Sequence, residues 1–227
     1  MLKTETYFCQ MKREVKLTHD GSKTLYVAEL DEHYHSIHGA RQESEHVFIQ
    51  WGLKQSSSVS SLSILEVGFG TGLNALLTVL SQPNDQHIQY VGIEPFPVDE
   101  DLLAEYSVMF SSEEQLLFNQ LHQAEWNKSV LIKSHFQLEK VNVKLENYSA
   151  IEQFDLIYFD AFGPRAQAEL WVLPVLEKMY RLTRKGGRLV TYCAKGQVKR
   201  DLKSAGFTVT SVSGPPGKRE MTIATKF

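Results

Sequence analysis

Residues 63–80 read SILEVGFGTGLNALLTVL, and this stretch decides the fold that we expect for the chain. An apolar run with β-branched residues leads into glycines at positions 68, 70 and 72, and a run with helical spacing follows. Glycine lacks a Cβ and reaches positive φ angles, so a glycine loop between a strand and a helix lets a ligand approach the backbone closely. The stretch therefore predicts the first strand and helix of an α/β sheet that binds a nucleotide-like ligand.

Strands and helices alternate along the rest of the chain. Further strands are expected at 87–94, 141–145, 154–162 and 186–193. Helices are expected at 73–81, 98–110, 113–126, 168–183 and 197–206. The last two strands, 207–213 and 220–227, have no helix between them, so the second should run antiparallel. This order predicts a Rossmann-like α/β fold, with a seven-stranded, mostly parallel sheet that ends in an antiparallel hairpin.

The N-terminal residues differ in character from the rest. Two short alternating runs on either side of Asp20-Gly21 predict a β-hairpin over about 14–30. Apolar residues within 47–53 predict a short helix, and a polar, serine-rich connector follows it. We therefore expect a small N-terminal extension, residues 1–60, in front of a larger domain, residues 61–227.

Charge is distributed unevenly along the chain. Residues 1–177 contain 12 Lys and Arg against 25 Asp and Glu, whereas residues 178–227 contain 12 against 2. A basic end on an acidic body indicates either a polyanionic partner or a set of solvated helix faces. The chain has two cysteines, no signal peptide pattern and no apolar run of ~18 residues, which favours a cytoplasmic protein without a membrane-spanning segment.

Ligands of such sheets bind outside the carboxyl ends of the strands, so the residues after each strand are the candidates for the site. The glycine spacing differs from the dinucleotide fingerprint, in which the third glycine comes three positions after the second. The sequence acid-x-Gly-x-Gly-x-Gly is instead similar to the cofactor loop of class I S-adenosylmethionine-dependent methyltransferases, which implies S-adenosyl-L-methionine as cofactor. The residues expected to bind it are Glu66, Gly68, Phe69, Gly70, Thr71, Gly72, Asn74, Glu94, Glu146 and Asn147.

Individual roles follow from this resemblance. Glu66 would accept a hydrogen bond from the cofactor's ammonium group, directly or through water. Glu94 ends the second strand, where an acid binds ribose hydroxyls. Glu146 and Asn147 follow the third expected strand and would hold the adenine amine, or would lie in a solvated loop.

Asp160 ends a strand that is otherwise almost entirely apolar, and a carboxylate there needs a partner. Methyltransferases that act on amines place Asp or Asn at this position, followed by Pro and an aromatic residue. The run Asp160-Ala161-Phe162-Gly163-Pro164 departs from that order but keeps the acid and an aromatic ring. It implies Asp160 as the catalytic residue that binds the attacking amine. Phe162 would stack on the substrate base, or would belong to the core.

Several runs together resemble the methyltransferase domain of one family, the bifunctional tRNA 5-methylaminomethyl-2-thiouridine biosynthesis proteins, MnmC. These runs are HYHSIHGARQESEHVFIQ (33–50), GFGTGLN (68–74), FDAFGP with ELW (159–171), AGFTV (205–209) and GKREM (217–221). The resemblance implies methylation of the exocyclic amine of 5-aminomethyl-(2-thio)uridine at wobble position 34 of tRNA. The chain ends at residue 227, without room for the family's FAD-dependent domain, so we expect a stand-alone methyltransferase.

The implied partner is the anticodon stem-loop of tRNA, whose wobble base must leave its stack and whose phosphates need cations. The expected substrate-binding residues are Phe162, Pro164, Lys195, Lys218 and Arg219. The histidines at 33, 35, 38 and 46 fit no familiar metal spacing, so no metal is expected. Two alternatives stay open at this point: an aminopropyltransferase of the spermidine synthase type, and a non-catalytic tRNA-binding module of the same fold. The sequence predicts no oligomeric state.

Overall fold

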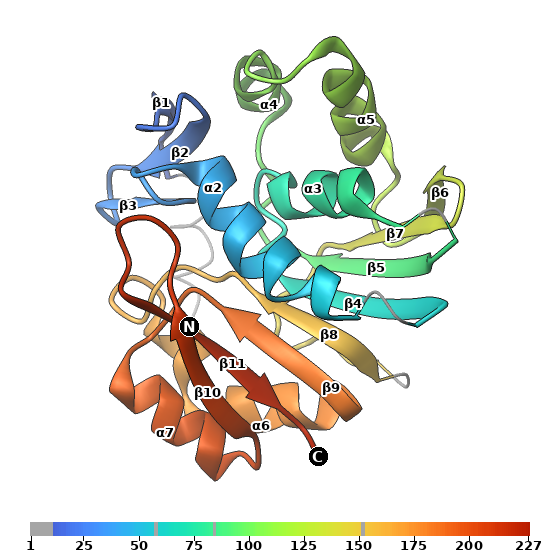
Figure 1. Ribbon diagram of the computed structural model, residues 1–227. Coiled ribbons are helices and arrows are strands. Elements are labelled where there is room, and N and C mark those ends of the chain that lie inside the picture. The colour runs from blue at the N-terminus through green and yellow to red at the C-terminus, as the bar shows by residue number, and fades with distance from the viewer. Residues whose placement is uncertain (1–10, 57–58, 84, 151–152) are drawn as a thin grey trace.

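A computed structural model describes residues 11–56, 59–83, 85–150 and 153–227 (Figure 1). Its larger sheet has the strand order β10-β11-β9-β8-β4-β5-β7-β6. These strands are β4 (Ser61–Val67), β5 (His87–Ile93), β6 (Ser129–Lys133), β7 (Phe136–Val141), β8 (Phe154–Phe159), β9 (Thr183–Thr191), β10 (Thr208–Ser213) and β11 (Glu220–Thr225). The five central strands, β9, β8, β4, β5 and β7, pair in parallel. The α/β fold with a C-terminal antiparallel hairpin is therefore confirmed.

Helices cover both faces of this sheet (Figure 1). They are α2 (Ala40–Ser44), α3 (Leu73–Ser81), α4 (Glu100–Ser107), α5 (Ser112–Gln123), α6 (Leu173–Leu182) and α7 (Gly196–Ser204). On one face, Ile64 of β4 packs in a cluster with residues of α3, α5 and the π-helical turn η1 (Glu45–Gln50). On the other face, the neighbouring Leu65 packs in a cluster with residues of α6 and α7. Because side chains alternate along a strand, both faces of β4 are buried, as its nearly continuous apolar run requires.

The predicted strand at 141–145 is wrong, because the third parallel strand is β7, which ends at Val141. Its alternate residues Phe136, Leu138 and Lys140 are all buried, and Lys140 is only 1% exposed. The Lys140 ammonium donates to the His122 carbonyl oxygen at 2.6 Å and lies 4.7 Å from the centre of the Trp126 ring. A lysine at a core position hid the strand's alternation. The antiparallel edge strand β6 was not predicted, so the sheet has eight strands among the described residues rather than seven.

The predicted helix at 168–183 is also interrupted. A 3-10 turn, η3 (Ala168–Trp171), comes first, and α6 begins only at Leu173. Pro174 lies in the first turn of α6, where its missing N–H costs no hydrogen bond. Val172 before the helix is extended, so the chain turns between the two pieces.

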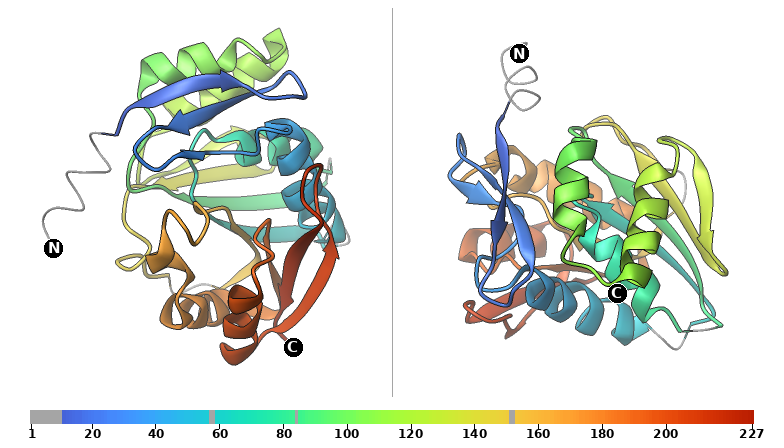
Figure 2. Two further views of the ribbon diagram at one scale, coloured as in Figure 1. Left: turned by 90° about the vertical axis from the view of Figure 1, so that its left-hand side faces the viewer. Right: turned by 90° about the horizontal axis from the view of Figure 1, so that it is seen from above.

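A second, three-stranded antiparallel sheet is formed by β1 (Arg13–Leu17), β2 (Lys23–Val27) and β3 (Glu32–His33), which confirms the predicted hairpin. It lies against α4, as the two views in Figure 2 show. The Arg13 guanidinium donates to the carbonyl oxygens of Phe96 and Pro97 at 3.1 and 3.0 Å. These bonds fix the small sheet beside the loop that follows β5. The boundary at residue 60 stays a prediction, and Val47 and Phe48 belong to the same core cluster as Ile64.

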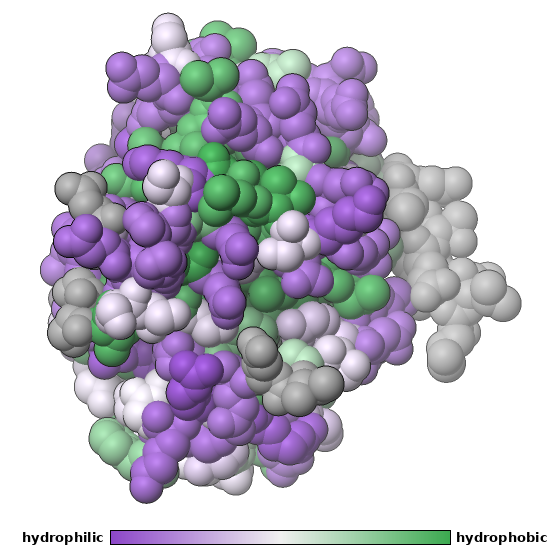
Figure 3. All heavy atoms as spheres, turned by 90° about the vertical axis from the view of Figure 1, so that its right-hand side faces the viewer, coloured by the Kyte–Doolittle hydropathy of each residue, from purple (hydrophilic) through white to green (hydrophobic). Residues whose placement is uncertain are grey.

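The opposite side of the molecule carries the β6 edge. Figure 3 shows this side as mostly hydrophilic, with hydrophobic residues forming a band between polar ones. In the part of the chain that the structure describes, no helix has the length and apolar character needed to cross a membrane.

Candidate active site

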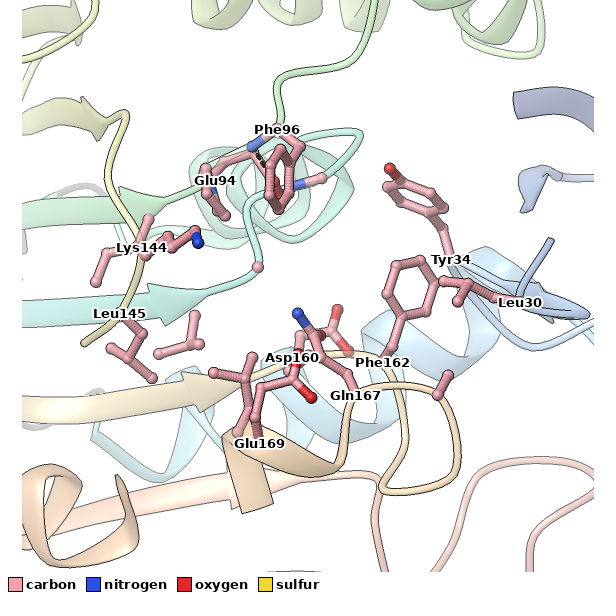
Figure 4. A pocket seen from close by; sticks show the side chains of 18 of the residues that line it. Leu30, Tyr34, Glu94, Phe96, Lys144, Leu145, Asp160, Phe162, Gln167 and Glu169 are labelled. Atoms are coloured by element: carbon pink, nitrogen blue, oxygen red, sulfur yellow. Dashed lines mark hydrogen bonds between the residues drawn. The ribbon is translucent and has the colours of Figure 1, made fainter. Parts of the chain in front are cut away.

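A cavity of about 1040 Å³ opens where β4, β5, β7 and β8 end. Figure 4 shows Glu94, Phe96 and Lys144 on one side of it, Leu30, Tyr34 and Phe162 on the other, and Asp160 with Gln167 between them. Among the residues predicted for the site, seven line this cavity: Gly68, Gly70, Glu94, Glu146, Asn147, Asp160 and Phe162. The loops that follow four different strands thus converge on one space, as expected for a sheet of this type.

The glycine loop follows β4 and borders this cavity. Gly68 has a φ of +90°, and a Cβ there would lie 2.7 Å from the Asp160 carbonyl oxygen. Gly70 has a φ of +51°, and its Cβ would lie 3.1 Å from the Tyr34 ring. Side chains at these positions would be strained and would displace neighbouring atoms. The loop can therefore pack this closely against Asp160 and Tyr34 only with glycine at these positions, and both glycines line the cavity.

Glu94 is held by the backbone on both sides. Its Oε2 accepts from the Gly70 N–H at 3.0 Å, and its Oε1 accepts from the Phe96 N–H at 2.9 Å. Burial raises the pKa of Glu94, while these two hydrogen bonds act in the opposite direction. A carboxylate fixed at the end of β5 still has lone pairs available for the hydroxyl groups of a sugar.

Glu66 lies beneath the loop and does not line the cavity. Its Oε1 accepts from the Asn74 side-chain amide at 2.8 Å, and its Oε2 accepts from the Tyr90 hydroxyl at 2.8 Å. The same Asn74 nitrogen donates to Asp160 Oδ2 at 2.7 Å. Asn74 therefore bridges the two carboxylates. A role of Glu66 toward the cofactor's ammonium group would act through this chain of hydrogen bonds.

Asp160 is the ionisable group at the centre of the site. Burial, followed by the nearby Glu43 carboxylate, raises its pKa from 3.8 to about 7, against the smaller opposing effects of Asn74 and Lys218. A carboxyl group with this pKa exchanges its proton near neutral pH, which suits a group that binds or accepts protons during a reaction.

An aromatic wall stands beside Asp160. The rings of Tyr34 and Phe162 meet edge to face, with centroids 5.1 Å apart and planes at 84°. The backbone on either side is pinned, because the Trp171 indole N–H donates to the Phe162 carbonyl oxygen at 2.7 Å. The Tyr192 hydroxyl donates to the Ala161 carbonyl oxygen at 2.8 Å. Phe162 is thus exposed to the cavity rather than fully in the core.

Other predicted cofactor residues support the loop from below. Phe69 is buried, and a Cβ on Gly92 would lie against its ring. The Thr71 hydroxyl bonds to the Tyr106 hydroxyl at 3.4 Å, and Gly72 precedes α3 in a left-handed conformation. None of these three loop residues lines the cavity.

Four predicted substrate residues line a second hollow, of about 730 Å³, next to the first: Pro164, Lys195, Lys218 and Arg219. Lys218 is already engaged inside the protein. Its ammonium forms an ion pair with Glu43 at 2.8 Å and lies 3.9 Å from the centre of the Tyr192 ring. We therefore revise the predicted role of Lys218, since an ammonium held in this way is poorly placed to bind a phosphate.

Several cavity residues were not predicted from the sequence, notably Met11, Arg13, Leu30, Tyr34, Phe96, Lys144, Gln167 and Glu169. Tyr34 lies in the run 33–50, which contributes to the family resemblance, but its contact with Phe162 was not predicted. Among the residues that the structure describes, no group of three or more His, Cys, Asp or Glu is placed to hold a metal ion.

Comparisons with known proteins agree with this geometry. The profile of the family described as S-adenosyl-L-methionine-dependent methyltransferase matches residues 101–227. Two relatives, from Cupriavidus metallidurans and Cupriavidus necator, are 32% and 33% identical to this chain over 224 and 215 residues. Both are tRNA 5-methylaminomethyl-2-thiouridine biosynthesis bifunctional proteins MnmC, which confirms the resemblance predicted from the sequence.

The coverage of these matches is unequal. They include 92% and 88% of this chain but 33% and 32% of the relatives, so the chain spans about a third of their length. The crystal structure of MNMC2 from Aquifex aeolicus has a TM-score of 0.77, over 99% of this chain and 75% of that one, at 24% identity. It has the same fold.

The residues present fit the cofactor of this family. Gly68 and Gly70 form a cradle of backbone without side chains along the cavity, and Glu94 is fixed beside them by its bond to the Gly70 N–H. Because the family profile matches more than half of the chain, and because the cavity provides this cradle, the chain belongs to the S-adenosyl-L-methionine-dependent methyltransferases and uses that cofactor.

Proposed function

We propose that the chain transfers a methyl group to the exocyclic amine of 5-aminomethyl-(2-thio)uridine at wobble position 34 of tRNA. The relatives named above support this reaction, since they are tRNA 5-methylaminomethyl-2-thiouridine biosynthesis proteins. One observation carries the proposal for this chain: the glycine loop, Glu94 and Asp160 line a single cavity. A group held by the loop and an amine held by Asp160 would share that space. A tRNA substrate agrees with the cytoplasmic location expected from the sequence.

The cofactor would be held by residues from three loops. Gly68 and Gly70 would contact it through their backbone, Glu94 would accept from the ribose hydroxyls, and Glu146 with Asn147 would border the adenine. When bound, S-adenosyl-L-methionine supplies a methyl group on a positively charged sulfur. Positioning this group and excluding water are the main tasks left to the protein.

Asp160 would hold the amine. An amine reacts through its lone pair, so it must lose its ammonium proton before attack. A carboxylate beside an ammonium group raises the pKa of that group, so orientation of the neutral amine is the first role of Asp160. Its carboxylate oxygens would accept an N–H hydrogen bond and aim the lone pair. With its own pKa at about 7, Asp160 is also suited to take the proton that the methylated amine releases.

The aromatic wall would hold the base. A wobble base has to leave its stack to reach a cavity of this kind, and extruded bases are read by stacking on aromatic side chains. Phe162 would provide the stacking surface, and Tyr34 supports its ring at 5.1 Å. Pro164 follows two residues later, lines the neighbouring hollow and would contact the substrate from there.

Mass analysis of wobble nucleosides tests this function. tRNA that carries 5-aminomethyl-uridine or its 2-thio form is incubated with the protein and S-adenosyl-L-methionine, then digested. The expected product is the 5-methylaminomethyl nucleoside. A parallel reaction contains decarboxylated cofactor and putrescine, and aminopropyl transfer there would support the spermidine-synthase-like alternative. Binding of tRNA with no transfer in either reaction would support the non-catalytic alternative.

A further inference from the structure

The second hollow lies directly behind the wall of the first. Phe162 lines the first cavity, and its neighbour Gly163 lines the second. Tyr192 lines the second, and its hydroxyl donates to the carbonyl oxygen of Ala161, which lines the first. Consecutive Cα atoms are ~3.8 Å apart, so a single segment of backbone, 161–163, separates the first cavity from the second hollow.

Most charged groups in the second hollow are already neutralised by a partner. Glu32 pairs with Arg165 at 3.1 Å, Glu220 pairs with Lys199 at 2.7 Å, and Lys218 pairs with Glu43. Lys195 and Arg219 also line the hollow, both are exposed, and neither forms an ion pair with any described residue. The hollow therefore presents two cations to an outside ligand.

The aromatic ring of the hollow is not available for stacking. The Lys218 ammonium lies 3.9 Å from the centre of the Tyr192 ring and covers one face, and the partly buried ring also packs against both core clusters. Stacked bases need an open aromatic face, whereas a phosphate needs cations. The chemistry of the second hollow thus favours a phosphate group over a second base.

We propose that Lys195 and Arg219 bind a backbone phosphate of the nucleotide next to the uridine that enters the first cavity. The inference rests on the proposed function, which it makes more specific. A uridine whose base lies beside Phe162 carries its sugar and phosphates at the cavity mouth, and Gly163–Arg165 form the path from there to the hollow. Arg219 can bind the phosphate oxygens in a bidentate manner, and Lys195 adds a point charge. Lys218 stays in its pair with Glu43 and acts as a structural cation.

Charge-removal variants test this site against a matched control. Lys195→Ala and Arg219→Ala each remove a cation from the hollow, and Lys203→Ala removes an exposed cation from α7 outside it. Binding of unmodified tRNA is measured at several salt concentrations, so this arm does not depend on turnover. We expect each hollow variant to weaken binding about tenfold and to reduce the salt slope by about 1, and Lys203→Ala to change the affinity less than about twofold. Equal effects of all three variants would refute the site.

Turnover with two substrates separates this inference from the proposed function. For tRNA that carries 5-aminomethyl-uridine, kcat/KM should fall about tenfold in each hollow variant. For the free nucleoside 5-aminomethyl-uridine, which has no phosphate, kcat/KM should stay within about twofold of the unaltered protein. A matching loss on the nucleoside would overturn the phosphate site while leaving methyl transfer intact. Absence of methyl transfer by the unaltered protein would instead refute the proposed function, and the binding experiment would still decide the site.

Discussion

Replacing Asp160 by asparagine should stabilise the fold, because the native site holds this carboxyl group at a cost. Its pKa rises from 3.8 to about 7, chiefly through burial. The difference between these values, at about 1.4 kcal/mol for each pH unit, sets an upper limit of about 4 kcal/mol. Asp160 is partly open to the cavity, so we expect a measured gain of about 2 kcal/mol for Asp160→Asn at pH 8.

The pH dependence gives this prediction its sign. Above pH 7, Asp160 is ionised in both the folded and unfolded states, and folding carries the whole cost. As the pH falls from 7 toward 4, the folded protein takes up a proton that the unfolded chain does not, so the cost shrinks. The stability advantage of Asp160→Asn should therefore be largest above pH 7 and decrease at lower pH.

Urea unfolding of both proteins at pH 5 and pH 8, followed by circular dichroism, measures this difference. The asparagine keeps the size of the side chain, and its carbonyl oxygen can still accept from Asn74. A variant that is no more stable than the parent at pH 8, or whose advantage does not change between the two pH values, would refute the reasoning about burial.

Three further predictions concern the loop, the buried ion pair and Glu94. Gly68→Ala should lose about 1–3 kcal/mol of stability and bind S-adenosyl-L-methionine at least tenfold more weakly. The control Gly186→Ala is also at positive φ but has open space around the added Cβ, so it should keep its cofactor affinity. Urea unfolding measures the stabilities and calorimetry the affinities, and equal cofactor affinities of the two variants would contradict the role of Gly68 in the cradle. Glu43→Gln and Lys218→Met should each destabilise the protein, and a double-mutant cycle should give a coupling of about 1–3 kcal/mol; strict additivity would count against the pair. Glu94→Gln places an amide N–H against the Gly70 or Phe96 N–H and should weaken cofactor binding about tenfold, as measured by calorimetry. Glu169→Gln changes a carboxylate elsewhere on the same cavity and should leave cofactor affinity unchanged. Similar losses of affinity in both variants would argue against binding of the ribose by Glu94.

The sequence predicted those parts of the fold and site that depend on local pattern. The strand before Gly68 and the helix at 73–81 follow from apolar spacing, and α3 has those bounds. The sequence also predicted that Asp160 lies near the glycine loop, because the carboxyl ends of parallel strands meet at one edge of a sheet. The Asp160 N–H does donate to the Val67 carbonyl oxygen at 3.0 Å.

Other features depend on contacts between distant parts of the chain. Tyr34 meets Phe162, and Glu43 pairs with Lys218 across 175 positions, which no local pattern encodes. The third strand was predicted at 141–145, too late in the chain, because a lysine at position 140 does not indicate by itself that it occupies a core position of β7. The prediction that Lys218 binds substrate was based on its charge, and the charge alone could not reveal the Glu43 carboxylate beside it.

The most direct test of the account is single-turnover methyl transfer to 5-aminomethyl-uridine in tRNA, with S-adenosyl-L-methionine affinity measured on the same samples of the unaltered protein and Asp160→Asn. The account predicts cofactor affinities within about threefold of each other and a rate of transfer at least about 100-fold lower in the variant, because the asparagine oxygen can still accept an N–H bond from the amine but the amide cannot take up the proton that the reaction releases. Full transfer by Asp160→Asn with intact cofactor binding would contradict it.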